Sequence, residues 1–428
     1  MAGDKSISHR ALILAACATG TSHIEGLLEG DDVLATARAM QALGARVERL
    51  GDGVYRVTGV GLGGLQSPSA ALDFGNAGTG VRLSIGLVAG AGLDAQFTGD
   101  ASLSARPMAR IMRPLEKMGA QFSAAEGDTL PLSVHGAPLM PADITPDVAS
   151  AQVKSALLLA GLHIAGDTII RETRLTRDHS ETMLALFGAK IERYEEDGRH
   201  VAHLSGPADL RATPIHVPGD PSSAAFPIIA ALIVPGSDIV LENIMLNRQR
   251  DGLIRVLQQM GGDITISGQR QASGETVGDL RIRHSSLHGV NVPADMAPDM
   301  IDEFPALAIA ASCASGDTHM AGLGELRVKE SDRLTAIAAG LASNGVRVQE
   351  GAETLSVTGG PVTGGGLVAT HHDHRIAMAF LCLGLVAENP VGIDDTAMIA
   401  TSFPNFFDLM NTLGAGFDTG FDTGFDNA

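Results

Sequence analysis

The residue types best suited to chemistry gather first at the predicted start of an apolar helix. Residues 3–10 read Gly-Asp-Lys-Ser-Ile-Ser-His-Arg, and an Ala- and Leu-rich run follows them. The free N–H groups and the dipole of a helix N-terminus favour an anion, and Lys5, Ser6 and Arg10 would add two charges and a hydroxyl there. On these residues alone, an anion site and a capped helix with solvated basic side chains are equally good interpretations.

A second candidate anion site is a Gly-rich turn that includes Asn76 and Gly78. Residues 76–82 read Asn-Ala-Gly-Thr-Gly-Val-Arg and stand before another apolar run. Backbone N–H groups of such a turn can hold a phosphate or carboxylate, although this turn matches neither the P-loop nor the dinucleotide fingerprint. Four more polar residues stand in turns or at helix starts, and each taken singly is better explained as a cap or surface charge: Arg106, Ser150, Gln152 and Arg177.

Two segments of the second half carry denser charge. In Arg327–Arg333, a helix would place Lys329 and Arg333 four residues apart on one face, with Glu330 as their neighbour. In the segment 299–305, Asp302 stands inside an apolar stretch. Acids in such surroundings have shifted pKa values, which makes Asp302 a candidate general base.

Residues 371–375 read His-His-Asp-His-Arg and could suggest a zinc site. His371 and His372 are adjacent, however, and cannot easily face one metal centre together. No second cluster of Cys or His supports them. We therefore predict no metal and interpret the segment as an anion-binding turn, carrying Arg375, that leads into a helix.

The elements that must position these residues follow an internal repeat. A short sequence pattern recurs six times: an amphipathic helix-like run that ends in Gly, followed by a strand-like run of alternating apolar and polar residues. Its glycines are at positions 44, 119, 188, 261, 345 and 414. A Gly after a helix is typical of a left-handed C-terminal cap. Residues 219–224 are also similar to residues 3–8, and each segment opens an apolar helix-like run. We therefore predict six α/β units, three before about residue 216 and three after it, with a cleft between two lobes.

The amino-acid composition restricts the classes of molecule that the chain could bind. The 428 residues carry 30 Lys and Arg against 49 Asp and Glu, a net charge of −19, and only 4% are aromatic. Such a chain is a poor match for nucleic acid or an anionic membrane, but a local cluster of cations can still bind a small anion. Apolar runs are too short to span a membrane, and no signal peptide is visible, so we expect a cytoplasmic protein. A Gly-Phe-Asp repeat over 416–428 predicts a low-complexity tail without fixed structure.

Taken in order, these motifs resemble the 5-enolpyruvylshikimate-3-phosphate (EPSP) synthase family. The resemblance rests on residues 3–10, 75–82, 327–333 and 373–378 and extends from Gly3 to about Gly414. It implies an inside-out α/β barrel of two lobes, each built from three βαβαββ units, over residues 6–216 and over residues 217–415 with 1–5. It also implies the reaction of the aromatic amino acid pathway in which the 5-hydroxyl of shikimate 3-phosphate adds to C2 of phosphoenolpyruvate and phosphate leaves. No metal or organic cofactor is implied.

The same resemblance implies a role for each candidate residue. Shikimate 3-phosphate would be held by Ser6, Arg10, Ser150, Gln152 and Arg177, with Lys329 near its reacting hydroxyl. Phosphoenolpyruvate would be held by Lys5, Gly78, Arg106, Gln152, Arg333 and Arg375, with Asn76 shaping the turn. Asp302 would accept the hydroxyl proton, Glu330 would protonate the methylene carbon, and Lys5 would assist. We expect a monomer whose lobes close on these substrates.

The sequences of residues 300–305 and 399–404 are similar to those of the glyphosate-tolerant bacterial class of this family, so glyphosate is a candidate inhibitor. Gly78, however, is Ala in the best-known tolerant members. Two alternatives stay open. One is the sister enolpyruvyl transferase that acts on UDP-N-acetylglucosamine, which uses a Cys on a mobile loop, whereas Cys17, Cys313 and Cys382 lie in apolar runs. The other is an anion-binding protein without turnover.

Overall fold

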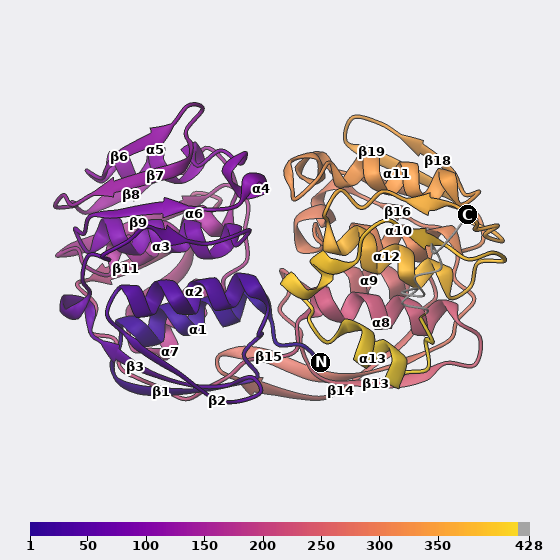
Figure 1. Ribbon diagram of the computed structural model, residues 1–428, viewed down its shortest axis with the longest axis horizontal. Coiled ribbons are helices and arrows are strands. Elements are labelled where there is room, and N and C mark those ends of the chain that lie inside the picture. The colour runs from indigo at the N-terminus through magenta and orange to yellow at the C-terminus, as the bar shows by residue number, and fades with distance from the viewer. Residues whose placement is uncertain (418–428) are drawn as a thin grey trace, which may run out of the picture.

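The computed structural model describes residues 1–417 and divides them into two lobes (Figure 1). Each lobe has three sheets on its outside and buried helices inside. Helices α1, α3 and α6 lie in the core of the first lobe, and α8, α10 and α12 in the core of the second. Every residue of α8 and α10 is buried, which suits helices that are apolar on all sides.

The first lobe holds three units, and in the second and third of them a helix separates two parallel strands. The first unit comprises α1 (Lys5–Cys17), β1 (Thr19–Glu25), α2 (Asp31–Ala42), β2 (Arg46–Gly51), β3 (Val54–Val60) and β12 (Ile215–His216). The second comprises β4 (Leu72–Asp73), α3 (Gly78–Gly90), β5 (Ala95–Thr98), α4 (Ala101–Ser104), α5 (Ala109–Lys117), β6 (Gln121–Ala125) and β7 (Thr129–His135), after the 3₁₀ helix η1 (Leu62–Gly64). The third comprises β8 (Ala142–Ile144), α6 (Ala151–Gly161), β9 (Gly166–Glu172), α7 (His179–Leu186), β10 (Lys190–Glu196) and β11 (Arg199–Gly206).

The second lobe repeats this order, but in the described residues the sheet of the fourth unit has three strands and that of the sixth unit has two. The fourth unit comprises α8 (Pro221–Ile233), β13 (Asp238–Met245), α9 (Gly252–Gln259), β14 (Asp263–Ala272) and β15 (Glu275–Arg283). The fifth comprises β16 (Asn291–Val292), η2 (Ala294–Asp299), α10 (Phe304–Ser312), β17 (Asp317–Ala321), η3 (Gly324–Val328), α11 (Arg333–Ser343), β18 (Arg347–Glu350) and β19 (Thr354–Thr358). The sixth comprises β20 (Leu367–Val368), α12 (His374–Gly384), β21 (Gly392–Ile393), η4 (Ala397–Thr401) and α13 (Phe406–Thr412).

The complete sheets share one strand order. Written from the first strand of each unit, they read β4-β5-β7-β6, β8-β9-β11-β10 and β16-β17-β19-β18. The first two strands of each unit are parallel, and the remaining pairs are antiparallel. In the first unit, β12 supplies the missing first strand and pairs with β1 in the register Ile24 to Ile215. The chain then passes to the second lobe, where Gly219 bridges both Gly3 and Ile244.

The six repeat glycines confirm the predicted helix caps. All of them have left-handed backbone, with φ between 81° and 109°. Five are followed by the expected strands β2, β6, β10, β14 and β18. The sixth prediction was wrong within the described residues, because no strand follows Gly414. Instead Phe417 stacks on Phe406 at 5.8 Å, so the predicted lack of structure is also wrong at the start of the tail. Residues 418–428 of that tail lie outside the described residues.

No helix in the described residues is long and apolar enough to cross a membrane.

The core of the first lobe depends on a close approach of α3 to α6. A Cβ atom at position 86 would lie 2.2 Å from the carbonyl oxygen of Ala156. A Cβ atom at position 90, one turn later, would lie 2.4 Å from that of Ala160. Only glycine allows two helix backbones this close.

Gly86→Ala is therefore expected to lower the free energy of unfolding by roughly 1–3 kcal/mol, because the added methyl must push α3 away from α6. Urea unfolding measures the change. Gly63→Ala is the matched control, since a Cβ there meets no described atom within 4 Å. Equal stability of the two variants would contradict this account of the packing.

Candidate active site

The cleft between the lobes collects nearly all the residues singled out in the sequence. Thirteen of the fourteen line it: Lys5, Ser6, Arg10, Asn76, Gly78, Arg106, Ser150, Gln152, Arg177, Asp302, Lys329, Glu330 and Arg375. Arg333 lies behind this surface with a side chain only 1% exposed. The structure thus brings together side chains that are more than 300 positions apart in the chain.

The core helices of both lobes present their starts to this cleft. The first turns of α1, α3 and α6 line it from one lobe, and those of α8 and α12 from the other. Asp302 stands just before α10, so the sixth core helix also begins here. Because a helix N-terminus carries a partial positive charge and free N–H groups, six of them together favour anions.

Asp302 is the meeting point of cations from both lobes. Lys329 Nζ lies 3.2 Å and Arg333 Nη1 lies 3.3 Å from its Oδ1, and Arg177 Nη2 of the other lobe donates to its Oδ2 over 2.9 Å. Arg375 donates to its backbone oxygen over 3.3 Å. Burial raises the pKa of Asp302, but these cations outweigh burial and hold the pKa well below its ordinary value. The carboxylate is therefore ionised, which is the form that a general base needs, while the same cations reduce its basicity.

One local prediction behind this cluster was wrong. Lys329 and Arg333 do not share a helix, because η3 ends at Val328 and α11 begins only at Arg333. Asp332 caps α11 by accepting from the Thr335 N–H over 3.1 Å, which starts the helix later than the charge spacing suggested. The two cations still converge, but they do so through the turn between η3 and α11.

Glu330 faces both lobes beside a buried ion pair. Arg333 donates to Glu330, and its Nε donates to Asp373 Oδ2 over 2.7 Å. Burial raises the pKa of Glu330, but Arg333 and then His374, Arg106 and Lys5 hold it well below its ordinary value. Asp373 also caps α12 and so links the placement of Arg333 to that of α12. In the sequence, Asp373 stands out only as part of a His-rich segment.

Three arginines of the first lobe have neutral partners. Arg10 donates to the hydroxyls of Ser180 over 2.8 Å and Ser155 over 2.7 Å. Arg106 donates to Asn76 Oδ1 over 2.7 Å and to a serine hydroxyl. Arg82 donates to the Gly78 carbonyl and to Gln152 Oε1, both over 3.2 Å. None of the three pairs with a carboxylate in residues 1–417, so their charges are available to an anion.

Burial acts directly on two of these arginines. It lowers the pKa of Arg10 to about 10. It also lowers the pKa of Arg82 to about 10, with further contributions from Arg110 and Arg106 nearby. The sequence motif contains Arg82 but did not indicate a role for it, and Arg110 was missed. The sequence signal for Arg110 was a second basic residue four positions after Arg106. Arg110 lies in the first turn of α5, and Arg106 precedes that helix.

The remaining predicted residues complete the first-lobe wall. Lys5 forms an ion pair with Asp32 of α2, a partner that sequence spacing did not suggest. Ser150 stands at the N-cap position of α6, but its hydroxyl makes no capping hydrogen bond and so differs from the cap expected. Gln152 Nε2 donates to Thr79 Oγ1 over 2.9 Å, which joins the starts of α3 and α6.

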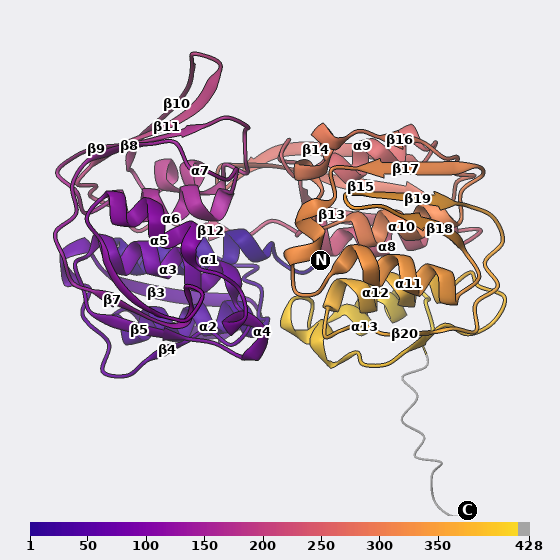
Figure 2. The ribbon, with the colours of Figure 1, turned by 90° about the horizontal axis from the view of Figure 1, so that it is seen from above.

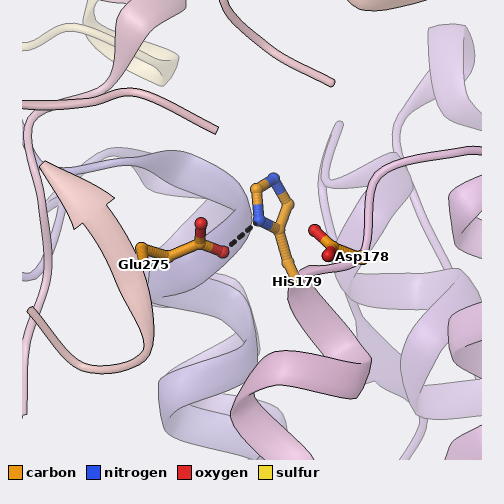
Figure 3. Close-up of side chains that lie close together, drawn as sticks. All are labelled: Asp178, His179 and Glu275. Atoms are coloured by element: carbon orange, nitrogen blue, oxygen red, sulfur yellow. Dashed lines mark hydrogen bonds and ion pairs between the residues drawn. The ribbon is translucent and has the colours of Figure 1, made fainter. Parts of the chain in front are cut away.

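The histidines of residues 371–374 do not form a common centre. His371 and His372 have left-handed backbone and are exposed, whereas His374 is buried at the start of α12. The described residues contain one group with metal-ligand spacing, Asp178, His179 and Glu275 (Figure 3). His179 Nδ1 already bonds Glu275 over 2.7 Å, and Asn247 donates to both carboxylates. Because these ligand atoms are engaged and cations lie beside them, the group does not fit a metal.

Comparison with known proteins now identifies the family. The family model described as EPSP synthase (3-phosphoshikimate 1-carboxyvinyltransferase) matches residues 1–410. The chain belongs to the EPSP synthase family. It is 57% identical over 424 residues to a 3-phosphoshikimate 1-carboxyvinyltransferase of Chelativorans sp. (strain BNC1), covering 96% of this chain and 93% of that protein. A protein of the same description from Parvibaculum lavamentivorans is also 57% identical, over 421 residues, covering 97% and 93%.

Solved structures agree with this family. The EPSP synthase of Acinetobacter baumannii has a TM-score of 0.86 and 44% identity, and the match covers 96% of this chain and 94% of that one. The enolpyruvyl transferase NikO of Streptomyces tendae, at 19% identity and a TM-score of 0.75, covers 96% and 93% and shares the fold. The predicted fold and family are confirmed. The predicted activity of a 3-phosphoshikimate 1-carboxyvinyltransferase is confirmed as well, because relatives that match nearly the whole chain carry that description.

One buried residue of the cleft makes stability depend on pH. Burial lowers the pKa of His374 to about 3, from 6.5 in an unfolded chain. Between these values the unfolded state binds more protons than the folded state. The contribution of His374 to stability is therefore full above pH 6.5 and is lost as the pH falls.

His374→Gln is expected to weaken this pH dependence. Between pH 7 and pH 5 the wild type loses up to about 2 kcal/mol through this residue, and the variant does not. Urea unfolding at the two pH values measures the difference. His372→Gln, whose parent side chain is 86% exposed, is the control and keeps the wild-type dependence. The same slope in both variants would show that His374 is not buried in its neutral form.

Proposed function

We propose that this cleft binds shikimate 3-phosphate and phosphoenolpyruvate side by side and joins them with release of phosphate. The observation that carries the proposal is the grouping of one ionised carboxylate, Asp302, with cations of both lobes, opposite arginines that have only neutral partners. Two polyanionic substrates need such an excess of positive charge, and a hydroxyl nucleophile needs a base.

The groups of the first lobe suit shikimate 3-phosphate. Arg10, with the hydroxyls of Ser6 and Ser150, would hold its phosphate, because charge-assisted hydrogen bonds to phosphate are strong. Gln152 and Arg177 would fix the ring. Lys329 Nζ, 3.2 Å from Asp302, would lie beside the reacting 5-hydroxyl and lower the cost of its ionisation.

The opposite part of the cleft suits phosphoenolpyruvate. Arg375 would bind its carboxylate from the second lobe. Arg333, whose guanidinium lies behind the cleft surface, would reach the same carboxylate when the lobes close. Arg106 and Lys5 would bind its phosphate from the first, with the start of α3 at Gly78 adding a helix N-terminus. Gln152 would reach both substrates. Asn76 would act by holding Arg106, since its Oδ1 accepts from that guanidinium over 2.7 Å.

Proton transfers would then use the two carboxylates. Asp302 would take the proton of the 5-hydroxyl of shikimate 3-phosphate while the hydroxyl oxygen attacks C2 of phosphoenolpyruvate. Glu330, assisted by Lys5, would give a proton to C3 of phosphoenolpyruvate. The anionic substrate would offset Arg333, Arg106 and Lys5, which hold the pKa of Glu330 low, and so would raise that pKa toward a protonated form. Glu330 then takes a proton back from C3 as the bond between C2 and the phosphate oxygen breaks, and the enol ether and free phosphate result.

We also propose the lobe boundaries and the state of the enzyme. The first lobe would comprise residues 6–216 and the second residues 217–415 together with 1–5, so Lys5, the first residue of α1, would stand at the boundary between them. The pairing of β12 with β1 and the bridge from Gly219 to Ile244 support a change of lobe between these positions. Because one chain supplies both walls of the cleft, it would act as a monomer whose lobes close on the substrates and exclude water.

The function is tested by phosphate release. We expect release only when phosphoenolpyruvate and shikimate 3-phosphate are both present. Equal activity with UDP-N-acetylglucosamine as acceptor would overturn the substrate assignment, and no release with any acceptor would indicate an anion-binding protein without turnover.

Asp302→Asn is expected to lower kcat by roughly 10²–10⁴, because the amide keeps the shape of the side chain but cannot accept the proton. The KM values should not rise, since the cleft loses a negative charge and its attraction for anions remains. Steady-state kinetics give both constants. Asp295→Asn, at an exposed aspartate of the preceding segment, should leave both unchanged. A kcat of Asp302→Asn equal to that of the wild type would show that Asp302 is not the base.

We further propose that glyphosate binds in the phosphoenolpyruvate part of the cleft and that this chain is similar to the tolerant bacterial class. A Cβ atom at position 78 would lie 2.9 Å from Arg82 Nη1 and 3.2 Å from Arg106 Nη1. A methyl group there would press on the guanidinium groups that face the ligand. Gly78 therefore leaves room for an inhibitor slightly longer than phosphoenolpyruvate.

Gly78→Ala should weaken glyphosate inhibition by about ten- to a hundredfold, the equivalent of ~1–3 kcal/mol of overpacking. The KM for phosphoenolpyruvate should rise much less, because the shorter substrate avoids the methyl. Inhibition constants and KM measured on both proteins decide this. Parallel changes in the two constants would mean that position 78 does not discriminate between inhibitor and substrate.

A further inference from the structure

Helix α1 lies in the first lobe and α8 in the second (Figure 2). The segments directly before them pair with each other where the chain crosses between the lobes. Gly-Asp precedes both helices, and the proposed function uses only the first copy. The two segments pair through their backbones. The Asp4 N–H donates to Pro218 O over 2.7 Å, and the Asp220 N–H donates to Ala2 O over 3.0 Å. One helix N-terminus of each lobe is thereby held at the same point.

Each of the two aspartates caps its own helix and is buried. Asp4 Oδ1 accepts from the Ile7 N–H over 2.7 Å, and Asp220 Oδ1 accepts from the Ser222 N–H over 2.8 Å. Burial raises the pKa of Asp4, Arg250 opposes that rise, and Asp220 adds to it. Two buried carboxylates so close together need a cation between them.

Arg250 supplies that cation. Its Nη1 lies 3.1 Å from Asp4 Oδ2 and its Nη2 lies 2.9 Å from Asp220 Oδ1, while its side chain is only 2% exposed. The two Nη groups of the guanidinium each bond a separate carboxylate, so the one side chain holds both aspartates at once. A single side chain thus joins the first core helix of one lobe to the first core helix of the other.

The same contacts continue to the reacting groups. Arg250 Nη2 donates to Ser222 Oγ over 2.9 Å, and that hydroxyl donates to the buried carboxylate of Glu303. Glu303 follows Asp302 directly, and its Oε1 lies 4.0 Å from Arg375 Nη1. The start of α1 is therefore bonded directly to this guanidinium, and the segment that carries Asp302 is linked to it through the Ser222 hydroxyl.

A third contact ties in α7. His179 Nε2 lies 3.5 Å from Arg250 Nη1, and His179 Nδ1 bonds Glu275 at the start of β15 (Figure 3). Because a guanidinium only donates, Nε2 must accept and the proton must sit on Nδ1. Burial lowers the pKa of His179 well below its ordinary value, which keeps this neutral form. The next residue, Ser180, accepts from Arg10.

We propose that Arg250 is a positioning residue for the reaction. It fixes the start of α1, with Lys5 and Ser6, relative to Asp302 across the boundary between the lobes. Its guanidinium is already engaged by two carboxylates and a hydroxyl, so it acts through these groups. Misplacing reacting groups by 1 Å can cost about a hundredfold in rate. The inference rests on the proposed function.

The test separates positioning from stability. Arg250→Met leaves two buried carboxylates without a cation, so Tm and kcat both fall. Adding Asp4→Asn and Asp220→Asn removes those charges and keeps both helix caps, because Asn caps as well as Asp. In this triple variant we expect Tm to return toward the wild-type value while kcat stays about ten- to a hundredfold low and both KM values change little. Recovery of kcat together with Tm would overturn the inference.

Two further measurements complete the design. Arg248→Gln, at a neighbouring arginine that is 77% exposed, should keep the wild-type Tm and kcat. Small-angle X-ray scattering of the substrate-free proteins should show a broader range of interlobe distances in the triple variant than in the wild type or this control. Identical profiles would overturn the inference. Absence of phosphate release by the wild type would instead contradict the proposed function, and the scattering result would then decide this inference.

Discussion

Holding buried positive charge without a matching negative charge is the constraint on which the rest of this structure depends. The chain carries a net charge of −19, yet Arg10, Arg82 and Arg106 meet only hydroxyls, amides and carbonyls in the described residues. The starts of the core helices add further positive potential to the same cleft. Burial lowers the pKa values of Arg10 and Arg82. A bound anion would stabilise the charged form of both side chains.

The two walls of the cleft hold their cations in different ways. In the first lobe, cations are held by neutral groups and remain available for recognition. In the second lobe, cations surround Asp302 and Glu330 and hold the pKa of each carboxylate low. In the proposed mechanism, proton transfer would use the carboxylates of the second wall, and both walls would supply cations for anion binding. Arg177 of the first lobe joins the walls by donating to Asp302. This arrangement explains why the placement of one lobe against the other matters to the chemistry.

Local sequence determined the repeat and the family. A helix that ends in Gly requires left-handed backbone at that residue, and all six repeat glycines have it, because this conformation depends on the residue itself. The starts of α1 and α3 were also predictable, since each has its polar or Gly-rich turn directly before an apolar run. The ordered motifs then identified the EPSP synthase family, the fold and the candidate site residues, which the cleft brings together.

Only the tertiary structure decided how those residues are held. The charge spacing of Lys329 and Arg333 indicated one helix, but Asp332 starts that helix later, and the two meet through their contacts with Asp302. Arg250 bonds Asp4 across 246 positions, and no local pattern indicates such a pair. Periodicity and capping report on neighbours along the chain. The partners of a buried charge are chosen by the packing of the two lobes, which brings distant segments into a place where water cannot compensate them.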